Sequence, residues 1–253
     1  MSGPEPAGDD AERETHILLA RIARTLIDAV RELPPPSVPE ALCRTCASLV
    51  PDVSGLSLSV LGRDASMGFV LCASDEVAAQ LAEIQYTLGE GPGTDAVRLR
   101  APVFAADLTR APDARRWPLF SVQAAKAGAE AVFSLPLTGA AGALGTLDLY
   151  RAAAGPLDDD HVRTALLVAD ALTLAVTALD HASSDSGGVV TWLDGAESDR
   201  EEIHQATGML MVQLGVSAEE ALLRLRARAF ALGSTSLAIA QAIINGSTDI
   251  GHE

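Results

Sequence analysis

Three arginines near the C-terminal end of the chain are the residues whose type and spacing best suit a binding role. Arg224 and Arg228 are four positions apart and share one face of a predicted helix, while Arg226 lies on the other side of its apolar stripe. Guanidinium groups bind phosphate and stack on planar bases. The set therefore predicts either a site for a polyanion or a solvated helix face, and spacing alone leaves both open.

The remaining motifs argue against catalysis. Cys43 and Cys46 form a single CxxC inside a predicted helix, without a second pair, and we expect two small buried side chains instead of a metal or redox site. The glycines from Gly89 to Gly93 lack the Gly-Lys-Ser/Thr ending of a phosphate loop, and no HExxH, GxSxG or EF-hand pattern occurs. The sequence predicts no enzyme, no metal site and no identifiable cofactor.

Composition limits the possible partners. The chain of 253 residues is 48% hydrophobic, which excludes wholesale disorder, and its net charge of −16 gives no general attraction to nucleic acid. Any polyanion must therefore meet a local basic patch. Three cysteines do not make a disulfide framework in a chain of this length.

No membrane partner is expected. The first residues, MSGPEPAGDDAERE, lack the basic and apolar parts of a signal peptide. The longest apolar run, Thr164 to Leu179, is interrupted by Asp170 and is shorter than the ~20 residues of a membrane span. We expect a cytoplasmic protein.

The elements that position these residues fall into two groups. After an expected disordered tail over 1–13, the first group runs to residue 182 and alternates helices with short strands. Helices are predicted at 15–33, 38–50, 76–84, 117–127 and 158–180, and strands at 57–61, 69–72, 102–105, 132–137 and 144–150. Hairpin-forming strands and flanking helices predict an antiparallel α+β domain. The 15–33 helix either packs on this domain or pairs with a second copy of the chain.

The second group is helical. A linker is expected over 183–194, followed by a domain over 195–253. Capping boxes at Ser198 and Ser217 predict helices to about Leu214 and Gly233, and a third short helix spans about 237–244. The buried stripe of the middle helix is predicted to contain Ala221, Leu222, Leu225, Ala229 and Leu232, and Met209 and Met211 are expected in the core.

Two family resemblances cover most of the chain. The run from Arg200 to Met211, which contains AxGxLM, is followed by Gly215-Val-Ser and AxxxLRxxA; together they closely resemble the ANTAR domain of bacterial transcription antitermination regulators. The preceding part resembles a GAF domain through LGEGP at 88–92, Asp107-Leu108, Arg116-Trp117-Pro118 and LGTLDLY at 144–150. The resemblance implies an α+β GAF-type domain, an antiparallel sheet flanked by helices, followed by an all-α three-helix ANTAR domain.

The ANTAR resemblance implies a signal-responsive regulator of transcription antitermination. Such proteins bind RNA as homodimers, each output domain contacting one hairpin loop of a paired-hairpin leader. The residues expected to bind RNA are Arg200, His204, Gln205, Ala206, Gly208, Arg224, Arg226 and Arg228. Ala206 and Gly208 leave the backbone approachable, or else permit close helix packing.

The GAF resemblance implies a small-molecule ligand that the sequence does not identify. The candidate residues for a pocket lip are Gly89, Asp95, Arg98, Asp107, Arg116 and Trp117, which equally suit structural turns.

One departure favours an alternative function. Where relatives commonly carry basic residues at the start of the third helix and after it, this chain has Gly233-Ser-Thr-Ser236 and Asn245-Gly-Ser-Thr-Asp249. Few phosphate contacts can come from that end. The alternative is a ligand-sensing or protein-interaction module whose helical tail does not bind RNA. A DNA-binding regulator is disfavoured because no basic recognition helix is evident, and an enzyme is the least favoured.

Overall fold

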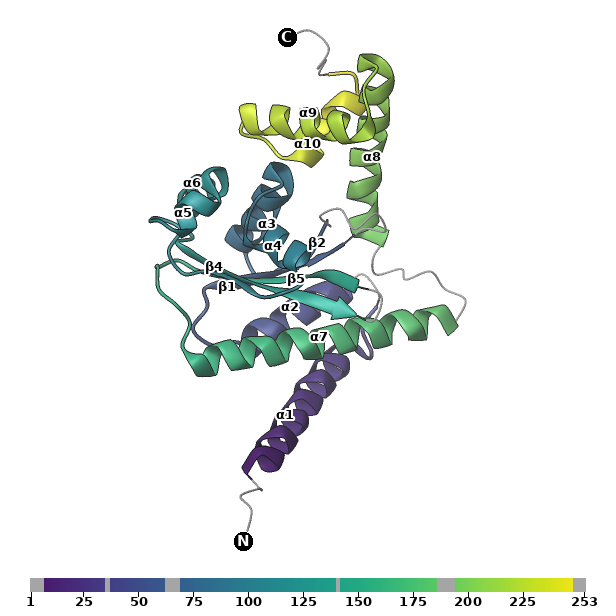
Figure 1. The fold of residues 1–253 in the computed structure, drawn as a ribbon. Coiled ribbons are helices and arrows are strands. Elements are labelled where there is room, and N and C mark those ends of the chain that lie inside the picture. The colour runs from purple at the N-terminus through teal and green to yellow at the C-terminus, as the bar shows by residue number, and fades with distance from the viewer. Residues whose placement is uncertain (1–6, 35–36, 62–68, 140–141, 186–193, 248–253) are drawn as a thin grey trace.

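The computed structural model describes residues 7–34, 37–61, 69–139, 142–185 and 194–247, with side chains omitted at 7–12, 69, 178–185 and 194–200. Its centre is a five-stranded antiparallel sheet in the order β2-β1-β5-β4-β3 (Figure 1). The strands are β1 (Gly55–Val60), β2 (Phe69–Ala73), β3 (Val103–Ala105), β4 (Ala131–Gly139) and β5 (Gly142–Arg151). The predicted antiparallel α+β domain is confirmed.

One face of the sheet is apolar and is covered by three helices. These are α1 (Ala7–Val30), α2 (Val38–Leu49) and α7 (Asp159–Asp185), which lie together below the sheet in Figure 1. Leu147 and Leu149 on β5 and Leu135 on β4 point to this side and are fully buried against them. Alternating strand side chains therefore supply the larger core of the domain.

The other face carries α3 (Glu76–Leu88), α4 (Pro92–Leu99), α5 (Asp113–Arg116) and α6 (Pro118–Ala127). A second apolar cluster around Phe120 and Trp117 lies under α6. Beneath α3 and α4, however, the sheet presents Ser57, Ser134 and Asp148, which are neighbours in register on three adjacent strands. This face is polar at its centre.

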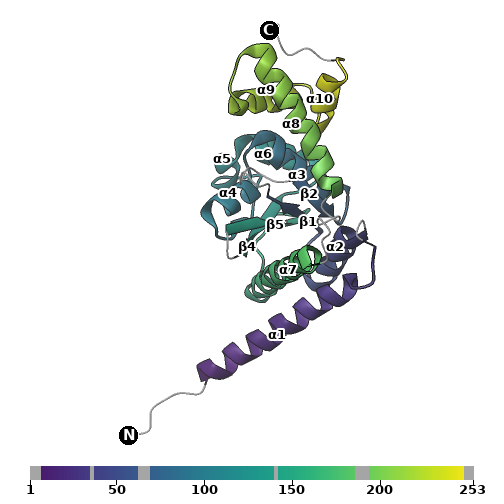
Figure 2. The ribbon, with the colours of Figure 1, turned by 90° about the vertical axis from the view of Figure 1, so that its right-hand side faces the viewer.

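Three further helices form a separate bundle over α3. They are α8 (Asp194–Leu214), α9 (Ala218–Ala231) and α10 (Ser236–Ile244), grouped at the top of Figures 1 and 2. Ser217 caps α9 by accepting from the Glu220 N–H at 3.2 Å, as its capping box predicts. Ala221, Leu225 and Ala229 of α9 are fully buried in the bundle core.

Several boundaries differ from the sequence predictions. The α1 helix begins at Ala7, inside the tail expected to be disordered, because its alanine, glutamate and arginine residues favour helix. The α4 helix occupies a stretch predicted as loop; Pro92 stands at its first turn, where the missing N–H costs nothing. The α7 helix continues to Asp185 and α8 begins at Asp194, both inside the expected linker.

Some side-chain expectations are wrong. Leu232 is 54% exposed because α9 ends at Ala231 and turns the chain away from the core. Met209 and Met211 are also partly exposed, at 40% and 36%. Cys43 is buried as predicted, but it is joined by a disulfide to Cys72 of β2 and does not pair with Cys46, which is a free buried thiol.

Candidate RNA interface and ligand pocket

The predicted RNA-binding arginines lie in three different environments on α9. Arg224 points to solvent and forms an ion pair with Glu220, one helical turn earlier, at 2.6 Å. An exposed pair of this kind contributes little to stability, so the Arg224 guanidinium is available to a ligand at small cost. Arg228 is half-buried on the same helix.

Arg226 is held by the neighbouring domain. Its guanidinium carbon lies 4.9 Å from the centre of the Tyr86 ring on α3, in cation–π geometry. Its Nε atom is buried and, within the described residues, has no hydrogen-bond partner. Arg226 therefore differs from Arg224 in being covered by the first domain.

The predicted residues of α8 divide into exposed and buried positions. His204 and Gln205 are exposed, and Gly208 has open space where a Cβ would stand. Ala206 is fully buried in the bundle core, so it packs helices and offers no backbone to a ligand. The side chain of Arg200 lies outside the described residues.

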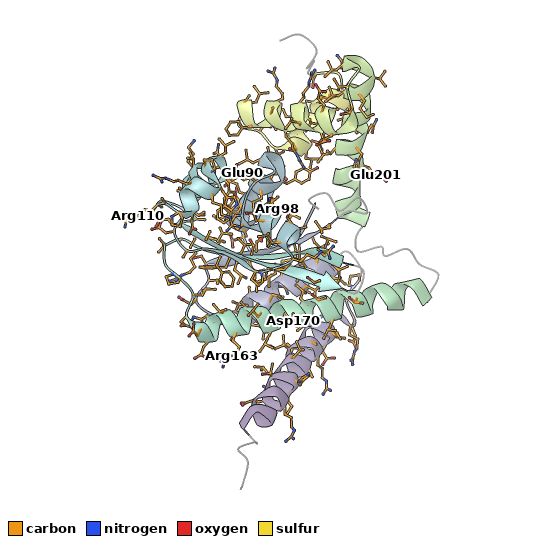
Figure 3. All side chains as sticks on the ribbon, viewed as in Figure 1. Glu90, Arg98, Arg110, Arg163, Asp170 and Glu201 are labelled. Atoms are coloured by element: carbon orange, nitrogen blue, oxygen red, sulfur yellow. A yellow bond between two sulfur atoms is a disulfide. The ribbon has the colours of Figure 1, made fainter. Side chains whose placement is uncertain are left out.

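The predicted pocket lip is a structural cluster centred on Asp95. This carboxylate pairs with Arg98 at 2.6 Å and Arg116 at 2.8 Å, and it accepts from Trp117 Nε1 at 3.2 Å. Arg116 also lies 4.5 Å from the centre of the Trp117 ring. These contacts join α4 to the α5–α6 segment. Arg98, which lies on α4, is labelled in Figure 3.

The other two candidates make local turn contacts. Gly89 adopts φ +65° as the left-handed cap that ends α3. Asp107 accepts from the backbone and hydroxyl of Thr109 at 3.0 and 2.5 Å, and these hydrogen bonds lower the pKa of its carboxyl. The contacts of the six predicted residues are thus ion pairs, hydrogen bonds and turns, as their structural alternative predicts.

The polar centre of the sheet is the better candidate for a ligand pocket. Gln85 Nε2 and Thr146 Oγ1 donate to Asp148 Oδ2 at 3.2 and 3.3 Å, and Gln85 Oε1 accepts from the Gly93 N–H at 2.6 Å. A cavity of about 10 Å³ at this point is barely large enough for one water molecule. The side chains themselves close the pocket.

Asp148 is a buried carboxyl surrounded by hydrogen-bond donors. Burial raises the pKa of Asp148 to about 6, against the opposing effect of its hydrogen bonds. The Ser134 hydroxyl, on the neighbouring strand β4, is one of the groups that oppose this rise, together with Gln85 and Thr146. Gly93 lets α4 approach closely here, because a Cβ would lie 3.0 Å from the Asp148 carboxylate oxygens and would press on them.

Sequence reasoning missed Asp148, Gln85 and Tyr86. Asp148 had a usable signal, since LGTLDLY places one acid among apolar residues of a strand buried on both faces. Gln85 and Tyr86 are ordinary residues of an amphipathic helix, and only the packing of two domains on α3 gives them a role.

Family comparisons agree with this architecture. The sequence model of the GAF domain matches residues 36–177, and that of the ANTAR domain matches residues 193–244. The chain therefore belongs to the GAF domain family. It is a GAF domain followed by an ANTAR domain, that is, a signal-sensing domain joined to a domain of RNA-binding antitermination regulators.

Several solved structures are similar to part of the chain. The GAF domain of an Acinetobacter phosphoenolpyruvate-protein phosphotransferase is 12% identical, with a TM-score of 0.48 over 68% of this chain and 98% of that one. The corresponding domain from Coxiella burnetii is 14% identical, with a TM-score of 0.47 over 66% and 98%. A type II free methionine-R-sulfoxide reductase from Thermoplasma acidophilum is 15% identical, with a TM-score of 0.41 over 57% and 93%. None of the curated proteins matches the chain.

No single described helix is both long and apolar enough to span a membrane; α9 and α10 reach that length and composition only together, across a bend of 110°.

Proposed function

We propose that this chain is a signal-responsive regulator of transcription antitermination that binds paired-hairpin leader RNA as a homodimer in the cytoplasm. The observation that carries the proposal is the arginine set on α9 of a domain that matches the ANTAR family. Arg224 and Arg228 of α9 supply guanidinium groups, and α8 of the same bundle contributes the exposed His204 and Gln205. Arg200 completes the proposed set.

A homodimer is supported by the free end of α1. This helix projects away from the GAF body in Figure 2, and Ile17 and Leu18 on it are 61% and 37% exposed. Leu26, by contrast, is fully buried against the apolar face of the GAF domain, so it belongs to the core of one protomer. Ile17→Glu with Leu18→Glu should give a monomer in analytical ultracentrifugation, while a dimer of unchanged mass would place the interface elsewhere.

The signal is proposed to be a small molecule that enters the polar side of the GAF sheet. The buried Asp148 carboxyl and the polar side chains around it support this location, because this face of the sheet is otherwise packed with apolar residues. A ligand that donates to Asp148 Oδ2 would displace the Gln85 side chain, which donates to the same atom. We place the domain division within 183–194, which limited proteolysis of the full chain should cleave first.

The proposed function is tested by titrating the full-length protein into labelled leader RNA. A leader with two adjacent hairpins should bind more tightly than either hairpin alone, since each output domain of a dimer holds one loop. Arg163→Ala is the matched control, because this α7 arginine is 71% exposed and lies at the opposite end of the molecule from α9 (Figure 3). Absence of binding to the paired hairpins at low salt would overturn the proposal.

The alternative is a sensing or protein-interaction module that does not bind RNA. The observation in its favour is the uncharged third helix, SLAIAQAII, together with the cover over Arg226. This reading predicts no RNA binding even when Arg226 is uncovered.

A further inference from the structure

Two opposite faces of α3 contact different parts of the molecule. Ala78, Leu81, Ala82 and Gln85 are buried against the GAF sheet, and Gln85 belongs to the Asp148 cluster. Glu83, Tyr86 and Thr87 lie on the opposite face, three and four positions apart, and meet the ANTAR domain. One rigid helix therefore touches both the candidate ligand pocket and the output domain.

The contact with the ANTAR domain is specific. The Ser236 N–H at the start of α10 donates to Glu83 Oε1 at 3.2 Å, and the Ser236 and Thr87 hydroxyls are hydrogen-bonded at 3.0 Å. Both hydroxyl-bearing residues are buried, with Ser236 at 0% and Thr87 at 7% exposure. A buried polar pair of this kind specifies one docking geometry, because separation without water would leave both groups unsatisfied.

Tyr86 extends the contact to the RNA side. Its ring packs against the ANTAR core cluster and carries the Arg226 guanidinium on its face. Arg226 also reaches the C-terminal end of α3, where a Cβ on Gly89 would lie 3.6 Å from one guanidinium nitrogen. The negative end of a helix dipole favours a cation at this place.

The docked surface is incompletely packed. A cavity of about 430 Å³ lies between α3 and the α9–α10 turn, with Glu76, Gln80, Phe230 and Ser234 in its wall. Packing contacts are lost along such a gap. On α3, the specific contacts with the ANTAR domain are the Ser236 hydrogen bonds and the Tyr86–Arg226 contact. Elsewhere α8 also packs against β2 of the GAF domain.

We propose that the outer face of α3 is a docking surface for this chain's own ANTAR domain, and that RNA and α3 compete for Arg226. In the docked state Arg226 is held on Tyr86 and is withheld from RNA. Movement of Gln85 when the pocket is occupied shifts α3 and releases the ANTAR domain. This inference rests on the proposed RNA-binding function.

Variants that weaken docking should strengthen RNA binding. Tyr86→Ala and, separately, Ser236→Ala in the full-length protein should each raise affinity for paired-hairpin RNA, on the order of fivefold or more, the lower end of typical couplings between sites. Gln80→Ala is the matched control, since Gln80 is exposed on the same α3 face and lines the cavity without a hydrogen bond to Ser236. Its affinity should equal that of the unmodified protein.

A covalent lock should have the opposite effect. The Thr87 and Ser236 hydroxyl oxygens are hydrogen-bonded at 3.0 Å, so Thr87→Cys with Ser236→Cys brings two thiols next to each other. Oxidation to a disulfide should lower RNA affinity. Reductant should restore binding. The unmodified protein with the same reductant controls for its own three cysteines. The lock tests the proposal independently of whether Tyr86→Ala folds.

Docking is also measured without RNA, by hydrogen exchange of the Ser236 amide. Faster exchange in Tyr86→Ala supports the docking contact, and unchanged exchange would overturn it. If Ser236 exchanged faster in the weakened variants, but RNA affinity were unchanged both in them and in the locked variant, the competition would be overturned and the RNA-binding function would stand. Failure of every variant to bind paired-hairpin RNA would instead overturn the proposed function itself.

Discussion

The GAF and ANTAR domains are stabilised in different ways. The GAF sheet separates two clusters of buried apolar side chains, one of them rich in leucine, on its two faces. The described ANTAR helices share one small cluster, in which Ala206, Ala221, Ala229 and Ala240 accompany a few larger residues. Alanine lets helices approach closely but buries little apolar area. The comparison indicates that the output domain is the weaker unit and that Tyr86 of the GAF domain supplements its core.

The strongest test of this difference is removal of one large side chain from each core. Leu225→Ala and Leu147→Ala each delete a fully buried leucine and should cost about 2–5 kcal/mol. That cost approaches the whole stability of a small helical domain, roughly 3–5 kcal/mol, but not that of the larger domain. Hydrogen exchange should therefore show the ANTAR domain of Leu225→Ala unfolded and the GAF domain of Leu147→Ala folded. Equal loss of protection in both domains for either variant would mean one cooperative unit.

The polar face of the GAF sheet should make its stability depend on pH. The folded pKa of Asp148, about 6, exceeds the ordinary value of 3.8, so the folded state favours the protonated carboxyl. The contribution of Asp148 to folding stability is therefore fully present below pH 3.8 and is lost as pH rises through 6. A pKa shift of this size lowers the free energy of unfolding above pH 6 by roughly 3 kcal/mol, relative to its value at low pH. Asp148→Asn should remove this dependence and raise the free energy of unfolding at pH 7.5.

Urea unfolding at several pH values measures the effect. Asp160→Asn, on α7, replaces a carboxylate whose side chain is 90% exposed and should leave the pH profile of the unmodified protein unchanged. Parallel profiles for Asp148→Asn and the unmodified protein would show that Asp148 ionises in the folded state as it does in the unfolded chain.

A smaller effect should separate structural ties from ligand contacts in the Asp95 cluster. Asp95→Ala leaves the Trp117 indole N–H without its acceptor and should cost about 1–3 kcal/mol. Arg98→Ala removes a side chain that is 70% exposed and should change the melting temperature only slightly. If Asp95→Ala had the same melting temperature as the unmodified protein, the Asp95 cluster would not be what holds α4 to the α5–α6 segment.

The sequence predicted the sheet, its flanking helices and the capped C-terminal helices because local periodicity and capping determine them. It failed at α4, where glycines and proline suggest a loop, since the close approach at Gly93 involves Asp148 on a distant strand. The cover over Arg226 was also unpredictable, because it depends on Tyr86, 140 positions earlier in the sequence.

The salt dependence of RNA binding tests the central claim most directly. With paired-hairpin leader RNA titrated at several salt concentrations, Arg224→Ala and Arg228→Ala should each lower affinity and reduce the log–log salt slope by roughly 0.7, as expected for one lost phosphate contact on single-stranded loops. Arg163→Ala should keep the slope of the unmodified protein. Slopes that are identical for all four proteins, or no binding at low salt, would contradict the assignment of RNA binding to α9.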